Sequence, residues 1–96
     1  MKTQSQILNL LQKNKEFLFK KYPIKELALF GSFARNEQNM QSDIDILVEF
    51  NSKVGMEFIE LADELEDLIQ IKVDLVSKNG IKDKYFRELE NELKYV

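Results

Sequence analysis

The stretch Leu27–Phe50 reads LALFGSFARNEQNMQSDIDILVEF, and its pattern predicts two strands joined by a turn. A short apolar run ends at Gly31, as in a buried strand, and a second apolar run extends from Ile44 to the end of the stretch. The segment between them is polar and rich in turn-forming residues. If the second strand runs back beside the first, the turn and the acids around Ile44 lie at the same end of one sheet.

Two aspartates mark the start of the second strand. Asp43 and Asp45 are two residues apart, and such residues point to the same face of a strand. Two carboxylates this close repel each other unless a cation lies between them. At the end of the first strand, Gly31 allows the backbone to approach a ligand, the turn offers N–H groups to phosphate oxygens, and Ser32 adds a hydroxyl donor. This combination predicts a phosphate-binding turn that faces a metal-binding acid pair, as two-metal phosphoryl transfer requires.

A third acid lies in a later strand. Asp74 has apolar neighbours in the segment Lys72–Val76, which reads KVDLV. An acid on a core strand is costly to bury without a partner, and a metal at the end of the sheet could be that partner. Asp74 could also accept the proton of an attacking hydroxyl. Because the chain has no histidine and no cysteine, its acid–base and metal chemistry must rest mainly on carboxylates, which favour Mg²⁺, Ca²⁺ or Mn²⁺.

Hydrophobic periodicity predicts alternating helices and strands along the whole chain. We expect helices at 3–21, 56–70 and 81–93, and strands at 27–30, 44–50 and 71–76. This order predicts a small α/β (α+β) fold, with a mixed sheet of three to four strands and helices packed against it. The length fits one domain spanning residues 1–96.

Charge and hydropathy narrow the classes of function. The formal net charge of −3 argues against direct nucleic-acid binding, because nucleic-acid-binding proteins are usually basic. The acidic charge favours a small nucleotide or a protein as the substrate. No apolar run approaches the length of a membrane span, and the N-terminus lacks the apolar core of a signal peptide. We therefore expect a cytoplasmic protein with no membrane partner.

The spacing of Gly-Ser, ten residues and then Asp-x-Asp resembles the signature of DNA polymerase beta-like nucleotidyltransferases. The chain is most similar to the minimal nucleotidyltransferases of prokaryotes, including the Lys-Val-Asp-Leu-Val strand after a helix, and the resemblance covers essentially the whole chain. The matching positions are Gly31, Ser32, Ala34, Arg35, Glu37, Ser42, Asp43, Ile44, Asp45, Leu47, Val48, Lys72, Val73, Asp74, Leu75 and Val76.

The resemblance implies a role for each of these polar residues. Asp43 and Asp45 would bind the metals that hold the triphosphate, and Asp74 would bind the catalytic metal and help to deprotonate the acceptor. Gly31 and Ser32 would contact the β- and γ-phosphates. The implied cofactor is Mg²⁺, or Mn²⁺ in its place, and the implied nucleotide is ATP.

Two positions near the turn leave alternatives open. Arg35 would assist with phosphate or with the turn, or it would simply bridge to Glu37 on the surface. Asn36 stands where the family usually has glycine. If that position has a positive φ, asparagine is the best substitute, so we expect the turn to survive, although the substitution could weaken nucleotide binding.

The resemblance also implies a biological setting. Minimal nucleotidyltransferases are commonly paired with a small all-helical HEPN toxin, and they act as antitoxins by transferring AMP from ATP to a tyrosine of the toxin. The first hypothesis is therefore a protein adenylyltransferase of a toxin–antitoxin pair. The alternatives are an antitoxin that neutralises the toxin by binding alone, and an adenylyltransferase acting on a small molecule.

Overall fold

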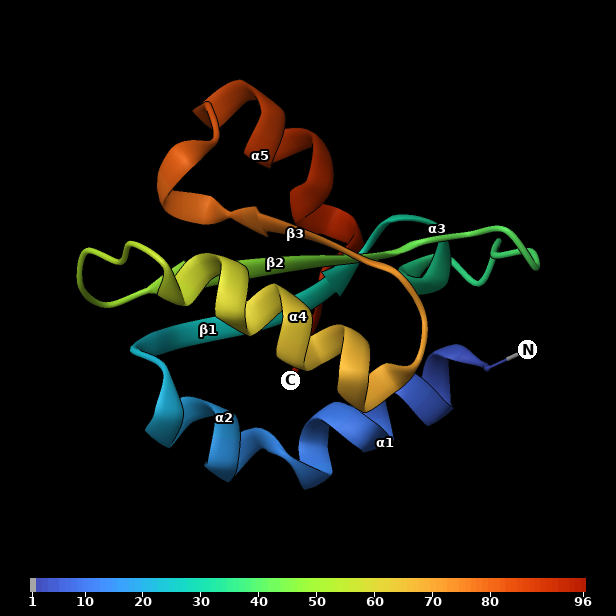
Figure 1. Cartoon of the computed structure of the whole chain (residues 1–96). Coiled ribbons are helices and arrows are strands. Elements are labelled where there is room, and N and C mark those ends of the chain that lie inside the picture. Colours follow the sequence, from blue (N-terminus) through green and yellow to red (C-terminus); the bar gives the residue numbers. More distant parts are fainter. Residues whose placement is uncertain (1) are drawn as a thin grey trace.

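The computed structural model describes residues 2–96 and contains a four-stranded sheet with helices on both of its faces (Figure 1). The helices are α1 (Gln4–Lys13), α2 (Lys15–Lys21), α3 (Gly31–Ala34), α4 (Glu57–Ile69) and α5 (Asp83–Leu89), with the 3-10 turns η1 (Lys78–Gly80) and η2 (Glu90–Glu92). The strands are β1 (Ile24–Phe30), β2 (Ile44–Phe50), β3 (Val73–Ser77) and β4 (Lys94–Tyr95). Within residues 2–96, no helix is both long enough and apolar enough to cross a membrane.

The sheet has the strand order β3-β2-β1-β4 and is mixed. Strands β1 and β2 pair antiparallel, which confirms that the second strand returns beside the first. Strand β3 pairs parallel with β2, and the connection between them contains α4, since parallel neighbours need a long crossover. The short strand β4 pairs antiparallel with the outer side of β1.

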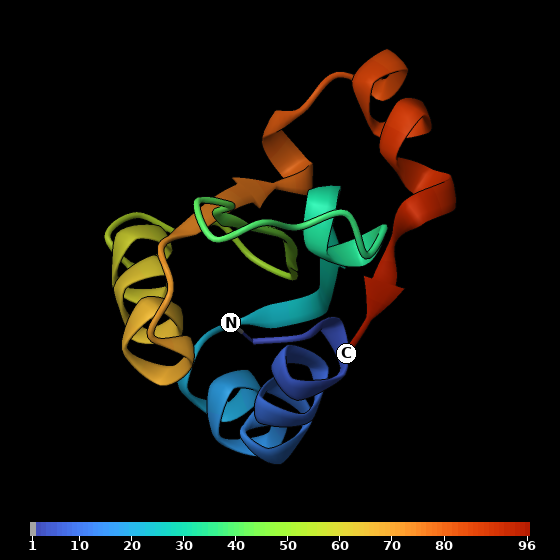
Figure 2. The same ribbon diagram turned by 90° about the vertical axis from the view of Figure 1, so that its right-hand side faces the viewer.

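The main core lies between the sheet and the layer formed by α1, α2 and α4 (Figure 2). Strand β2 supplies Ile44, Ile46 and Val48 to this core, because alternate residues of a strand point to the same face. Helix α4 supplies every fourth residue: Leu61, Leu65 and Ile69 are fully buried. This spacing is the apolar face of an amphipathic helix, as the sequence predicts.

A second, smaller apolar cluster covers the opposite face of the sheet. Phe30 of β1 and Leu47 of β2 pack there with Leu89 of α5, and the partly buried Val76 joins them from β3. Because Asp45 and Leu47 are two residues apart on one strand, Asp45 shares this α5 side of the sheet. The same alternation places Asp74 on the side of Val76.

The helix expected at 3–21 is two helices, α1 and α2, which meet at Asn14. The side-chain Nδ2 of Asn14 donates a hydrogen bond to the Leu10 carbonyl at 2.8 Å, and the Asn14 backbone has left the helical region at φ −104° and ψ 5°. Asparagine competes in this way for the carbonyl groups that a continuous helix would use. The break directs Leu18 into the core and leaves Phe17 exposed.

Five further differences from the sequence-based expectations are smaller in extent. The polar turn after β1 contains a short helix, α3, and the last helix is α5 followed by η2 rather than one helix over 81–93. The sheet has four strands, within the expected three to four, but the sequence indicates no position for β4, since its two residues carry no alternating pattern and depend on pairing with β1. Strand β1 begins at Ile24 rather than 27, and β3 spans 73–77 rather than 71–76.

The α4 face offers a direct test of the main core. Leu61→Ala should lower the free energy of unfolding by about 2–5 kcal/mol, because Leu61 is fully buried and its removal leaves a cavity. Ile59→Ala on the same helix is the matched control: Ile59 is exposed, and its loss should change stability by no more than about 0.5 kcal/mol. Urea denaturation followed by circular dichroism measures both, and equal effects would contradict this placement of α4.

Candidate active site

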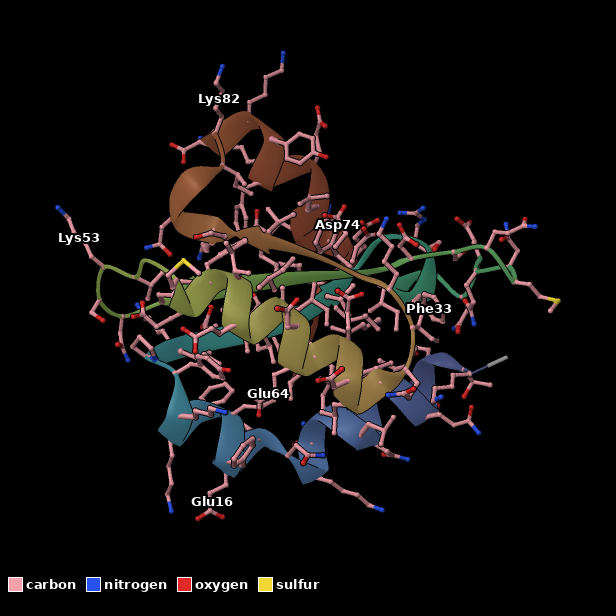
Figure 3. The ribbon with its side chains drawn as sticks, viewed as in Figure 1. Glu16, Phe33, Lys53, Glu64, Asp74 and Lys82 are labelled. Atoms are coloured by element: carbon pink, nitrogen blue, oxygen red, sulfur yellow. The ribbon has the colours of Figure 1, made fainter. Side chains whose placement is uncertain are left out.

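The predicted acids meet where β1 ends and where β2 and β3 begin. Asp45 lies opposite Phe30, the last residue of β1, and it pairs with Asp74 across the parallel β2–β3 ladder. Asp43 is exposed one residue before β2 begins. Figure 3 shows Asp74 on the α5 side of the sheet. The three aspartates therefore converge on one end of the sheet from two strands.

Asp45 is held in an environment that disfavours its charge. Burial raises the pKa of its carboxyl group from about 3.8 to about 6, and the charges of Asp74 and Asp43 add to this effect. A side-chain hydrogen bond with Asp74 acts in the same direction, while Arg35 opposes it. A half-buried carboxylate repelled by two exposed ones forms a site that a cation would stabilise.

Carboxylates are ligands that Mg²⁺ prefers, and the distances between the three aspartates determine which of them could bind one ion together. Asp45 and Asp74 are paired across the β2–β3 ladder, and the charges of Asp74 and Asp43 both raise the pKa of Asp45. Among residues 2–96, no group of three acidic side chains already has the geometry of a metal-binding cluster. A set of carboxylate donors fits a magnesium ion, and the residues that would hold it are Asp45 and Asp74, which are paired across the β2–β3 ladder, together with the exposed Asp43.

Gly31 lies directly against the Asp45 carboxylate. Its φ of +76° belongs to the region that side chains other than glycine rarely adopt. A Cβ atom placed on Gly31 would overlap Oδ2 of Asp45. Glycine at this position therefore serves two purposes, since it permits the turn and leaves room for the acid. Ser32 follows it, half-buried, as the second residue of α3.

The turn ends with Asn36 in the left-handed region at φ 56°. The position where the family usually has glycine therefore has a positive φ, as the sequence-based expectation required. Asparagine tolerates this conformation better than most residues. The chain continues through Glu37, whose backbone N–H donates to the Ser32 carbonyl at 2.8 Å. The turn is therefore intact with asparagine.

Arg35 bridges two glutamates. Its Nε donates to Oε1 of Glu37 at 2.8 Å, as one of the two sequence-based alternatives predicts, and its Nη1 donates to Oε2 of Glu92 at 2.8 Å. Hydrogen bonds to Glu37 and then to Glu92 raise the pKa of the Arg35 guanidinium further, so that it stays charged. Its role toward phosphate stays a prediction.

Glu92 was missed by reasoning from the sequence. Its Oε1 accepts a hydrogen bond from the Gly31 backbone N–H at 3.0 Å, while Oε2 accepts from Arg35. Glu92 follows Glu88 and Glu90 in an acidic segment, and its spacing alone gives no reason to single it out. Only the return of the chain through η2 to β4 brings it beside the turn.

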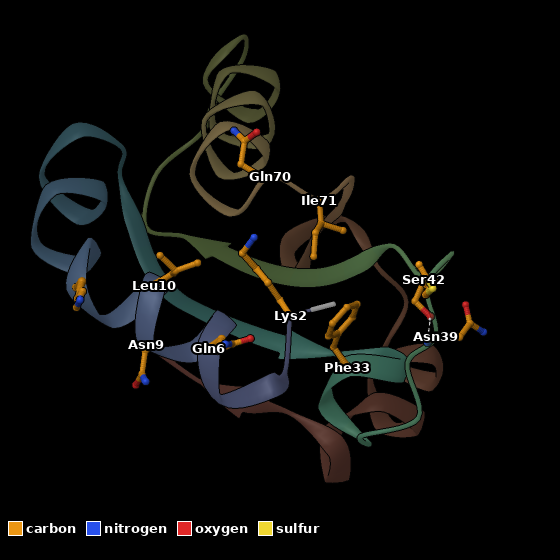
Figure 4. Close-up of a pocket in the computed structure, with 11 residues that line it drawn as sticks. Lys2, Gln6, Asn9, Leu10, Phe33, Asn39, Ser42, Gln70 and Ile71 are labelled. Atoms are coloured by element: carbon orange, nitrogen blue, oxygen red, sulfur yellow. Dashed lines mark hydrogen bonds between the residues drawn. The ribbon is translucent and has the colours of Figure 1, made fainter.

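A cavity of about 720 Å³ lies at the same end of the molecule, but on the α1 side (Figure 4). Ser42, which precedes Asp43, contributes to its wall together with Phe33 of α3. Its other lining residues are Lys2, Gln6, Asn9, Leu10, Lys13, Asn39, Met40, Gln70 and Ile71. The three aspartates are not part of this lining, so the cavity adjoins the acid site without containing it.

Comparison with known proteins agrees with this geometry. The sequence model of the family described as "Nucleotidyltransferase domain" matches residues 11–96. A "Putative protein adenylyltransferase" of Methanocaldococcus jannaschii is 52% identical over 98 residues, with 100% of each chain covered. "Protein adenylyltransferase MntA" of Thermococcus cleftensis is 36% identical over 97 residues, covering 100% of this chain and 98% of that relative. A crystal structure of a toxin–antitoxin with AMP-PNP matches with a TM-score of 0.70 at 26% identity, over 96% of this chain and 70% of that chain.

Adding one methyl group at Gly31 tests its contact with Asp45. Gly31→Ala should lower the free energy of unfolding by roughly 1–3 kcal/mol, because alanine is strained at this φ and its methyl group overlaps the carboxylate. Gly80→Ala is the control, since a Cβ atom there meets no atom within 4 Å. Thermal or urea unfolding measures both variants, and a Gly31→Ala protein as stable as the control would refute the close contact.

The raised pKa of Asp45 predicts a pH-dependent instability in the absence of metal. A carboxyl group whose folded pKa lies near 6 and whose ordinary pKa is about 3.8 contributes stability below pH 4, and this contribution is lost as the pH rises through 6. Asp45→Asn removes the charge, so in EDTA its melting temperature should exceed that of the unsubstituted protein by a few degrees at pH 7.5. The difference should shrink toward pH 4.5.

The control for this experiment is Asp67→Asn, which changes an exposed acid of α4. Differential scanning calorimetry at several pH values in EDTA measures all three proteins. If Asp45→Asn lowers the melting temperature at pH 7.5, Asp45 is not under the repulsion described here.

Proposed function

This chain is a member of the nucleotidyltransferase domain family, and on that premise we propose that it transfers AMP from ATP to a hydroxyl group of a partner protein. The observation that carries the proposal is the placement of Asp45 against Gly31 and opposite Asp74 in the β2–β3 register. Two acids on neighbouring strands face the glycine turn, which is the arrangement that metal-assisted phosphoryl transfer needs. The relatives named protein adenylyltransferases support AMP as the transferred group.

The proposed roles follow the positions of the side chains. Asp45 and Asp74, joined by Asp43, would hold Mg²⁺, which would offset the negative charge that develops on the phosphate groups during transfer. The Gly31 N–H and the Ser32 hydroxyl would bind the terminal phosphates of ATP. Arg35 would bind phosphate from the other side of the turn.

The reaction joins the acceptor oxygen to the α-phosphorus of ATP. As that bond forms, the bond between the α-phosphorus and the oxygen that leads to the β-phosphate breaks, and pyrophosphate leaves. The proton of the acceptor hydroxyl passes to the carboxylate of Asp74, since a general base must lie within reach of the attacking group. The products are a protein with AMP attached through a phosphodiester bond, and pyrophosphate.

We propose a tyrosine of a small helical HEPN toxin as the acceptor, so that the protein acts as the antitoxin of the pair. This finer assignment rests on the resemblance to minimal nucleotidyltransferases, and the toxin–antitoxin structure with AMP-PNP supports it at 26% identity. Neutralisation by binding alone is less well supported. A protein that acts only by binding its partner would gain nothing from Asp45, a carboxyl group whose ionisation is opposed by burial and by two neighbouring aspartates.

The test uses the purified protein, ATP, Mg²⁺ and the protein encoded next to it. Intact mass spectrometry should show the partner gaining one or more AMP groups. Asp43→Ala combined with Asp45→Ala should abolish this gain, because it removes two of the three carboxylates that would hold Mg²⁺. Asp63→Ala combined with Asp67→Ala removes the same charge from exposed positions on α4 and should leave the gain intact.

Other results would point elsewhere. A stable complex without any gain in mass, formed equally by both double variants, would replace the transferase by an antitoxin that acts through binding. If the partner gains no mass and forms no complex, the toxin is ruled out as the partner. Transfer of AMP to small molecules such as aminoglycosides would then be measured.

A further inference from the structure

Glu92 occupies the donors that the proposed function assigns to a phosphate group. One carboxylate oxygen accepts the Gly31 backbone N–H at 3.0 Å, and the other accepts Nη1 of Arg35 at 2.8 Å. A glycine N–H and an arginine fork are a common pair of donors to phosphate oxygens. The Glu92 carboxylate therefore takes up hydrogen bonds that a bound triphosphate would also require.

Arg35 contacts two glutamates, and Glu92 is the more enclosed of them. The Glu92 side chain is 19% exposed, whereas that of Glu37 is 65% exposed. Burial raises the pKa of Glu92, but the hydrogen bonds from Arg35 and Gly31 outweigh it and lower the pKa below its ordinary value. Glu92 is therefore a largely enclosed anion beside Gly31 and Arg35.

The backbone around Glu92 is fixed independently of this carboxylate. Lys94 pairs with Leu29 across β4 and β1, and the N–H of Val96 donates to the Leu27 carbonyl at 2.9 Å. On the other side of Glu92, Leu89 is buried in the smaller apolar cluster. The carboxylate can consequently leave Gly31 and Arg35 by side-chain rotation, while the main chain stays in place.

We propose that Glu92 is a positioning residue of the nucleotide site, whose carboxylate takes the position of a phosphate group and is displaced when a nucleoside triphosphate binds. This inference rests on the proposed function, since it requires Gly31 and Arg35 to bind the triphosphate. In the absence of nucleotide, Glu92 occupies the Gly31 N–H and the Arg35 guanidinium. Nucleotide binding must overcome the two hydrogen bonds of Glu92.

The decisive variant is Glu92→Gln. Its side-chain oxygen can still accept the Gly31 N–H, but it no longer carries the charge that pairs with Arg35. Removing this competition should tighten the binding of ATP with Mg²⁺ by about tenfold, because hydrogen bonds between charged groups are the stronger ones. Isothermal titration calorimetry with ATP and Mg²⁺ measures the dissociation constants. Glu90→Gln, an exposed glutamate of the same η2 turn, is the control and should leave affinity unchanged.

A double-variant cycle identifies the route of the effect. The gain from Glu92→Gln should disappear in an Arg35→Ala background, because the competition acts through the guanidinium. Glu92→Asp keeps the charge but shortens the side chain by one methylene group, and it should tighten binding less than Glu92→Gln. Circular dichroism confirms that each variant is folded before it is titrated.

The outcomes separate this inference from the proposed function. If the unsubstituted protein binds ATP and Glu92→Gln binds it equally or more weakly, Glu92 merely holds the chain to the turn and the inference fails alone. If Glu92→Gln binds ATP where the unsubstituted protein does not, the inference stands in its strongest form. If neither protein binds ATP, the proposed function fails, and the inference fails with it.

Discussion

The register of β2 is the constraint on which the rest of the site depends. Asp45 has Phe30 on one side and Asp74 on the other, through antiparallel and parallel pairing respectively. A slip of one residue would move Asp45 to the main core and expose the isoleucines on either side of it. The apolar residues of β2 face two different clusters, so a one-residue slip would remove apolar residues from both clusters. Packing thus fixes the positions of the acids.

The apolar clusters also offset the cost of the acids. Asp45 lies at the boundary between the smaller cluster and solvent, where burial and two neighbouring aspartates all oppose its ionisation. Active sites commonly retain such unfavourable arrangements because the chemistry requires them, while the remaining structure supplies the stability. Here the fully buried residues of α4 and β2 provide that stability on the opposite face of the sheet.

Much of this arrangement could be predicted from local sequence. The apolar runs and the Asp-x-Asp pattern identify β2, and the four-residue spacing identifies α4, because both depend on periodicity. The Asn14 break could not be predicted in this way, since one polar residue within a periodic segment is usually tolerated. Strand β4 and Glu92 depend on pairing with residues far away in the chain, and local patterns carry no information about such contacts. The candidate acids were therefore found, while their neighbour Glu92 was not.

The wide separation of these residues along the chain has a consequence for folding kinetics. Strands β1 and β2 form a nearly local pair, whereas Asp74 reaches β2 only after the α4 crossover, and the bond from Gly31 to Glu92 spans 61 residues. Contacts between distant residues generally form after local ones, because closing long loops costs more entropy. A refolding chain would thus place Asp43 and Asp45 beside the Gly31 turn well before Asp74 arrives.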